Sequence, residues 1–222
     1  MKRTFIFLLK LSLVMAFIGA FKTDAKPSKV DALLAKGNAK AKQPLKRAGQ
    51  IDGLTFLRRA SIDIIGRIPT HAEIEQFQKW PAAERRSKII DKLLADPRYA
   101  DRWTVFLSDI LRIRSNATGG NALLAYIHKA LEENRPWDEL ARKMISANGT
   151  TGNAPAVGFI LGEDADPMAL AAATSQMFLG VRMQCAQCHN HPFDVWKQKQ
   201  FYELATYFGK TRRMENQFSR RV

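Results

Sequence analysis

Hydrophobic residues recur three and four positions apart along most of the chain, which is the spacing of one face of a helix. Glycine, proline and asparagine interrupt this pattern and divide it into segments. Helices are predicted over residues 54–65, 70–77, 81–94, 99–111, 123–131, 137–145, 167–178 and 197–208. No alternating apolar and polar run is long enough to predict a sheet. The pattern therefore predicts a mainly α fold, built as a single multi-helix domain.

Residues near the ends of these segments support the boundaries. Thr70 and Glu73 have the spacing of a capping box, which opens a helix. Pro81 fits the first position of the next helix. A loop is predicted over residues 148–158, and the short run 30–34 is the one helical candidate near the N-terminus.

The N-terminus has the features of a secretory signal peptide over residues 1–25. Basic Lys2 and Arg3 precede a mostly apolar stretch, and small residues favour cleavage after Ala25. The most apolar part, residues 11–21, is too short to cross a bilayer, and an uncleaved membrane anchor is the alternative. We therefore expect export to the periplasm or the extracellular space, with no stable membrane span after cleavage.

The rest of the chain divides by composition into three parts. Residues 26–50 are rich in lysine and alanine and predict a flexible basic linker. Residues 51–210 are long enough for one domain with its own core, and residues 211–222 form a basic tail. The formal charge of +14 lies mostly in the flanks, because residues 51–209 hold 19 basic and 18 acidic residues. A nucleic-acid groove would place basic charge on the folded body, so no nucleic-acid partner is expected.

The two cysteines lie in the sequence Cys185-Ala-Gln-Cys188-His189, near the end of the predicted domain. This Cys-x-x-Cys-His pattern is the attachment motif of c-type haem. Two thiols about one helical turn apart can add to the two vinyl groups of one porphyrin, and the adjacent histidine then becomes an axial ligand of the iron. Cys185, Cys188 and His189 are therefore the candidate residues for covalent haem c.

Two alternatives to haem remain for this motif. Zinc is the first, because His191 and Asp194 lie near enough in sequence to complete a four-ligand set with Cys185 and Cys188. Against zinc, structural sites usually draw on two separated ligand pairs, and the second pair is missing. The second alternative is a disulfide or two free structural thiols.

The sixth ligand of a bound haem is open. His191 is two residues from His189, too near to reach the opposite face of the iron, so hydrogen bonding within the loop is its expected role. Met177, Met183 and Met214 are candidate distal ligands. Packing in the core is nevertheless the expected role of each methionine.

The remaining histidines and the tryptophans are expected to be structural. His71 is predicted to be exposed in the first turn of a helix, and His128 to be a hydrogen-bonded core histidine. The tryptophans are predicted core anchors. No nucleophile elbow, phosphate loop or carboxylate pair indicates catalysis, so an electron carrier or binding module is favoured over an enzyme.

Several segments resemble one protein family. They are residues 56–59, 63–70, 91–103, 134–140 and the stretch 178–208 around the cysteine motif. Over roughly residues 51–210 the chain is similar to the planctomycete-type cytochrome-c-like domain family (PSCyt, second domain type), a domain of unknown function. The resemblance implies an exported protein, and the family is called cytochrome-like largely because of the Cys-x-x-Cys-His motif. Relatives usually continue into a C-terminal companion domain, which is not expected within this chain.

Motif, compartment and resemblance together predict an exported c-type haem protein. Its role would be electron transfer or redox partnering with another envelope protein. The alternative from a different class is a non-redox interaction or assembly module stabilised by zinc or a disulfide at the loop. An accessory domain of an envelope hydrolytic system rests on family analogy alone.

Overall fold

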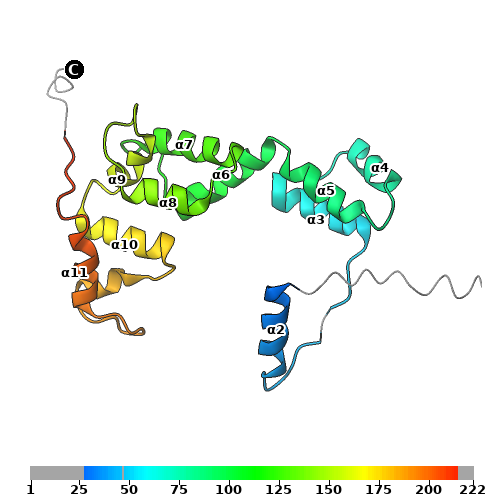
Figure 1. Ribbon diagram of the computed structural model, residues 1–222, viewed down its shortest axis with the longest axis horizontal. Helices are drawn as coiled ribbons and strands as arrows, with labels where there is room; N and C mark the ends of the chain where they lie inside the picture. Colours follow the sequence, from blue (N-terminus) through cyan, green and yellow to red (C-terminus); the bar gives the residue numbers. More distant parts are fainter. Residues whose placement is uncertain (1–27, 47, 215–222) are drawn as a thin grey trace, which may run out of the picture. The chain divides into compact units, whose positions relative to one another are not determined.

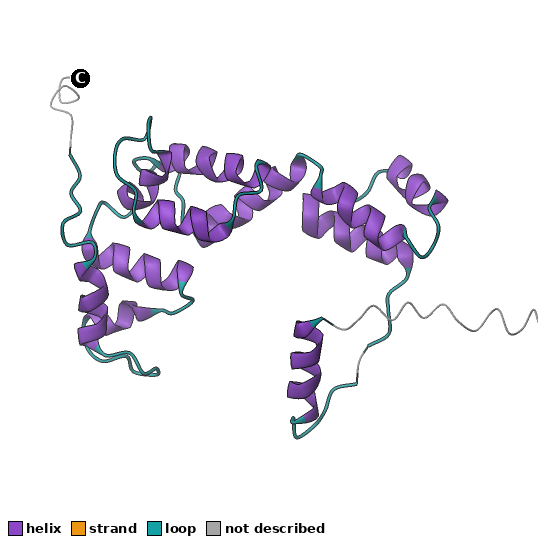
Figure 2. Cartoon of the chain, in the orientation of Figure 1, coloured by secondary structure: helices purple, strands orange, loops and turns teal. Residues whose placement is uncertain are grey.

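The computed structural model describes residues 28–46 and 48–214, and these form helices, turns and loops without a strand (Figure 2). The prediction of a mainly α fold is therefore confirmed, while the predicted signal peptide lies outside the described residues. The helices in chain order are α2 (Lys29–Ala39), α3 (Gly53–Ile65), α4 (His71–Lys79), α5 (Arg85–Leu94), α6 (Arg98–Ile110), α7 (Gly120–Glu132), α8 (Trp137–Ile145), the 3-10 helix η1 (Pro155–Val157), α9 (Gly158–Gly162), α10 (Pro167–Phe178), the 3-10 helix η2 (Met183–Gln187) and α11 (Gln198–Thr206).

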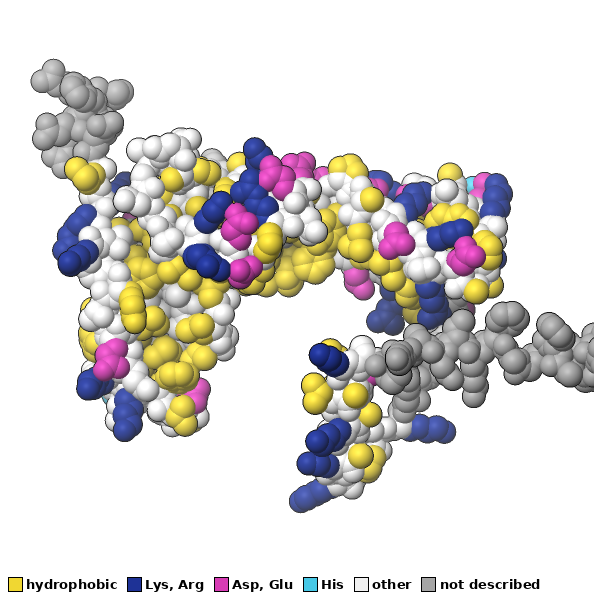
Figure 3. Space-filling view, viewed as in Figure 1, with side chains coloured by type: hydrophobic (Ala, Val, Ile, Leu, Met, Phe, Trp, Pro, Cys, Tyr) yellow, Lys and Arg dark blue, Asp and Glu magenta, His cyan; other side chains and the backbone are white. Residues whose placement is uncertain are grey.

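The chain divides into two units, Met1–Gln50 and Ile51–Val222. In the first unit, α2 begins with a capping box between Ser28 and Asp31 and is longer than the predicted run 30–34. None of its side chains is buried, and Figure 3 shows basic and hydrophobic side chains next to one another on this helix.

In the second unit, α3, α4 and α5 pack around one hydrophobic cluster (Figure 1). The cap of α3 is Asp52, whose carboxylate accepts hydrogen bonds from the N–H groups of Leu54 and Thr55. The helix ends at Gly66, which adopts a left-handed φ of 74°. A Cβ there would lie 2.8 Å from Cδ of Arg102, so the glycine also lets α6 approach. The buried members of this cluster are Leu57, Ile65, Phe77, Ile89 and Leu93.

The helices α6 and α7 form an antiparallel pair within a second cluster. At one end of the pair, Nε2 of His128 lies 2.9 Å from a carboxylate oxygen of Asp101. At the other end α9 makes a close approach, where a Cβ on Gly158 would lie 2.4 Å from the carbonyl oxygen of Gly119. The largest buried side chains of this cluster are Leu111, Leu123, Ile127, Leu140, Met144, Phe159, Ile160, Leu170 and Phe208.

A third cluster joins α10, η2 and α11 and carries the cysteine motif. Its buried members come from all three elements and are mostly small, which allows the helices to lie close together. They are Ala171, Met183, Ala186, Phe201 and Ala205. The motif therefore lies on elements that share a packed core.

Two local predictions differ from the structure. Pro81 does not start α5: it opens a turn closed by the N–H of Glu84, and the helix begins at Arg85. The predicted loop 148–158 contains η1 and runs into α9, and residues 156–160 are all buried. A short buried segment that is apolar on every side has no amphipathic period to reveal it.

Within the described ranges, no helix has both the length and the apolar character needed to cross a membrane.

Candidate functional site

The two cysteine thiols project from the same side of η2. Cys185 lies within the 3-10 helix, and Cys188 is its C-cap residue with helical backbone angles. Side chains three residues apart in a 3-10 helix nearly eclipse one another. Met183 and Ala186, also three apart, are buried in the third cluster, and both cysteines are free and exposed. Burial of one pair thus turns the other pair toward solvent.

His189 follows the second cysteine and is held in one tautomer. Its Nδ1 lies 2.5 Å from the backbone carbonyl oxygen of Asn190. A carbonyl oxygen only accepts, so Nδ1 must carry the proton and donate. In the neutral form of this exposed ring the lone pair then resides on Nε2, as in a metal-binding histidine whose other nitrogen donates to a carbonyl.

The backbone of the motif is held by the first turns of α11. The side-chain amide of Gln198 donates to the carbonyl oxygens of Gln187 and Cys188, both at 3.1 Å. The hydroxyl of Tyr202 donates to the same Gln187 oxygen at 3.1 Å. Nothing in the sequence distinguishes Gln198 or Tyr202, because polar residues on an exposed helix face carry no periodic pattern of their own.

The residues of the zinc alternative have other partners. Nδ1 of His191 accepts a hydrogen bond from the backbone N–H of Phe193 at 3.2 Å. The backbone N–H of His191 donates to the Trp196 carbonyl at 2.8 Å. A carboxylate oxygen of Asp194 accepts from the N–H of Val195 at 2.7 Å. In the part of the chain that the structure describes, no three metal-ligating side chains converge on one point. His191 therefore contributes to the fold of the loop in this arrangement.

The three candidate distal methionines lie in different environments. Met183 is 4% exposed within the third cluster, and Met177 is half-buried against the second. Met214 is 93% exposed, so the expectation of core packing is wrong for this residue. It lies beyond α11, the last helix among the described residues.

A family model, PSCyt2, described as a protein of unknown function (DUF1549), matches residues 29–213. The chain belongs to the PSCyt2 family. The match begins at the first residue of α2, upstream of the region 51–210 over which the resemblance is apparent by inspection. No curated protein and no solved structure matches the chain.

Other polar candidates in this PSCyt2 domain are structural. The side chain of His71 is 88% exposed, as predicted. His128 is wrongly predicted as a core histidine: it is partly exposed and bridges Asp101 of α6 and Glu132 of its own helix. Trp137 is 43% exposed and lies against Phe178, so the prediction of a core anchor fails there.

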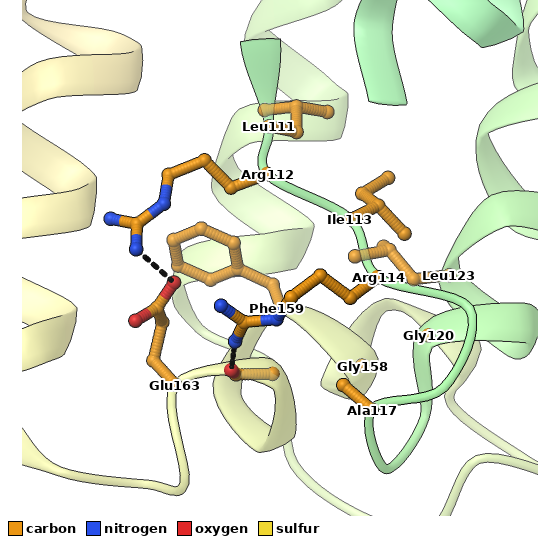
Figure 4. A pocket seen from close by; sticks show the side chains of 11 residues that line it. Leu111, Arg112, Ile113, Arg114, Ala117, Gly120, Leu123, Gly158, Phe159 and Glu163 are labelled. Carbon is orange, nitrogen blue, oxygen red and sulfur yellow. Dashed lines mark hydrogen bonds and ion pairs between the residues drawn. The ribbon is translucent and has the colours of Figure 1, made fainter. Parts of the chain in front are cut away.

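A small cavity lies where the segment after α6 meets α9 (Figure 4). The guanidinium of Arg114 donates to the carbonyl of Gly162, and that of Arg112 faces the carboxylate of Glu163 at 4.0 Å. The cavity has a volume of about 10 Å³, which is room for about one water molecule. Both arginines therefore have partners within this PSCyt2 domain.

Proposed function

We propose that this protein is an exported c-type haem-binding protein that carries electrons to or from a partner protein in the cell envelope. The observation that carries the proposal is the arrangement of Cys185, Cys188 and His189. Two free thiols leave η2 on one side, and the histidine that follows Cys188 bonds through Nδ1 and leaves Nε2 available to a metal. Covalent haem c requires these three groups, so the residues present fit the group.

Each residue has a distinct part in holding the group. The thiols of Cys185 and Cys188 would add across the two vinyl double bonds of the haem, forming carbon–sulfur bonds while the thiol hydrogens pass to the neighbouring vinyl carbons. His189 would supply Nε2 to the iron while its Nδ1 stays bonded to the Asn190 carbonyl. The bound haem supplies an iron that accepts and releases one electron. The exposed position of the motif favours transfer to a docked protein partner over chemistry in an enclosed pocket.

Haem is favoured over zinc because of the hydrogen bonds of His191. Binding zinc through Nδ1 would break the bond from the Phe193 N–H. Binding through Nε2 would need the proton moved to Nδ1, where the same N–H would oppose it. The haem motif needs no such rearrangement, because both thiols are free and the hydrogen bond of His189 engages Nδ1 and not Nε2.

The decisive experiment is a visible spectrum of the full chain from a host with haem-maturation machinery, together with haem staining on a denaturing gel. We expect a reduced α-band and a stain that survives denaturation. Changing Cys185 and Cys188 together to Ser should remove both, because no carbon–sulfur bond can form. The matched control is Gln184→Ser, an exposed neighbour in the same 3-10 helix that should keep the full stain.

A colourless parent protein with one equivalent of zinc would overturn the haem proposal and move the motif to a structural role. A colourless, metal-free protein whose two thiols cannot be titrated would instead identify a disulfide. Unchanged absorbance in the double-Ser variant would likewise refute covalent attachment.

A further inference from the structure

The segment that follows the cysteine motif is connected to α11 by a further hydrogen bond. The backbone N–H of Gln198 donates to the side-chain oxygen of Asn190 at 3.0 Å. The N–H groups of a first helical turn have no acceptor within the helix, so this amide oxygen satisfies one of them. The backbone carbonyl of the same asparagine accepts the Nδ1 proton of His189. Asn190 thus connects the start of α11 to the imidazole ring.

The side chains of α11 extend this connection to the cysteines. Gln198 and Tyr202 are four residues apart and share one face of the helix. Their side chains donate hydrogen bonds to two backbone carbonyls of the motif. One belongs to Cys188, the second cysteine, and the other to Gln187, the residue before it. Residues 187, 188 and 190 are therefore each hydrogen-bonded to α11, on both sides of His189.

The helix that makes these contacts is itself anchored in the core. Phe201 and Ala205 are 0% and 3% exposed and pack in the third cluster. The same cluster holds Met183 and Ala186 beneath the cysteines. The motif is thus held from below by packing and from the side by hydrogen bonds, which is the support that a precise ligand geometry needs.

We propose that Asn190 and Gln198 are positioning residues for haem ligation, which fix the orientation and tautomer of His189 and the backbone at Cys188. The inference rests on the proposed function, because a positioning role has meaning only if the motif binds haem. Neither residue touches the iron in this scheme; both act through the backbone and the imidazole. The hydrogen bond that Nδ1–H donates also makes Nε2 a stronger electron-pair donor to a metal.

The first test measures the tautomer of His189 without haem, by ¹⁵N NMR of the full chain carrying Cys185→Ser and Cys188→Ser at about pH 8, where histidine is neutral. Asn190→Ala keeps the backbone carbonyl that accepts the Nδ1 proton but removes the side-chain oxygen that holds it in place. The ratio of Nδ1–H to Nε2–H forms should therefore fall, by at most about fivefold, the equivalent of about 1 kcal/mol for one hydrogen bond. Asn190→Asp keeps an acceptor for the Gln198 N–H and should keep the ratio.

The second test measures the midpoint potential of the haem-loaded protein. Gln198→Glu keeps the size of the side chain but loses the two N–H donors to the motif. The matched control is Lys199→Gln, which makes the same change in charge at the next, exposed position. We expect a higher potential in Gln198→Glu than in the control, because a less firmly held imidazole donates more weakly to the oxidised iron.

Different results would refute the proposed function and the positioning role. A parent protein without covalent haem would refute the proposed function. A red parent protein would leave it standing. In that case, equal tautomer ratios in Asn190→Ala and Asn190→Asp, with equal potentials in Gln198→Glu and Lys199→Gln, would refute the positioning role alone.

Discussion

At the scale of single residues, the ion pair of Arg67 and Glu73 shows how one contact can stabilise a whole region. The guanidinium donates to both carboxylate oxygens of Glu73, at 2.8 and 2.7 Å, and the N–H of Thr70 donates at 2.7 Å. The bonds from Arg67 outweigh the effect of burial and lower the pKa of Glu73 from 4.5 to about 2. The capping box predicted from the sequence is therefore part of a larger network.

This low pKa makes stability depend on pH. Because the pKa of Glu73 is depressed in the folded state, its contribution is complete above about 4.5 and is lost as the pH falls toward 2. We expect Glu73→Gln to lower the free energy of unfolding by about 1–3 kcal/mol at neutral pH, and by much less near pH 2. Urea titrations at several pH values measure the difference.

The control for that prediction is Glu75→Gln on the same helix. Its carboxylate is half exposed and lies 3.8 Å from His71. An exposed pair of this kind contributes little. If the two variants show the same pH dependence, Glu73 has no special role.

Asn190 and Gln198 show that residues which hold the backbone of a site are hard to recognise from sequence. The thiols and His189 are recognisable because covalent attachment requires fixed residue types at fixed spacing. A residue that holds a backbone carbonyl needs only a donor at the right place, and several residue types offer one. Such a role becomes visible only when α11 is seen against the motif.

At the scale of elements, close backbone approaches decide where helices can meet. At Gly158 in α9, a Cβ would lie 2.4 Å from the Gly119 oxygen and 2.8 Å from Cβ of Leu123. At Gly162 of the same helix, no atom lies within 4 Å of an added Cβ. Packing thus requires a glycine at position 158 but not at position 162.

Substitution of these two glycines tests the contact. We expect Gly158→Ala to destabilise the protein by about 4 kcal/mol or more, because two backbone segments must separate. Gly162→Ala should change stability by less than about 1 kcal/mol, and in the stabilising direction. Thermal melts compare the pair, and similar midpoints would show that the α7–α9 contact is looser than described.

Element prediction from the sequence follows the amphipathic pattern. Helices such as α6 and α7, with one apolar face and one polar face, are predicted to within a few residues of their observed bounds. The start of α5 is displaced because Pro81 suits a turn as well as a first helical position. Both α9 and η1 are missed because residues 156–160 are buried without a break, so that hydropathy carries no period there.

At the scale of the whole molecule, α10 links the candidate site to the rest of the second unit. Leu170 and Ala173 pack in the second cluster, and Ala171 between them packs in the third. Neighbouring residues of one helix therefore belong to two cores. Damage to the second cluster should reach the motif through α10.

Export is the property of the whole chain that the haem proposal needs. Cleavage after Ala25 predicts a mature protein that begins at Lys26, which N-terminal sequencing and intact mass would show. Ala25→Phe should leave the precursor uncleaved, because only small residues fit the cleavage position. Ala41→Phe, beyond the cleavage site, should be processed normally, and recovery of the unprocessed parent chain would contradict the prediction.

The exposure of Cys185 and Cys188 has a consequence for the life of the protein before any cofactor arrives. Thiols on the outer side of η2 are as open to oxidants as they are to a maturation enzyme. In an oxidising compartment, two neighbouring thiols tend to form a disulfide. In a newly exported chain, disulfide formation would therefore compete with haem attachment. The final yield of haem protein would depend on how quickly a reductant converts the disulfide back to two thiols.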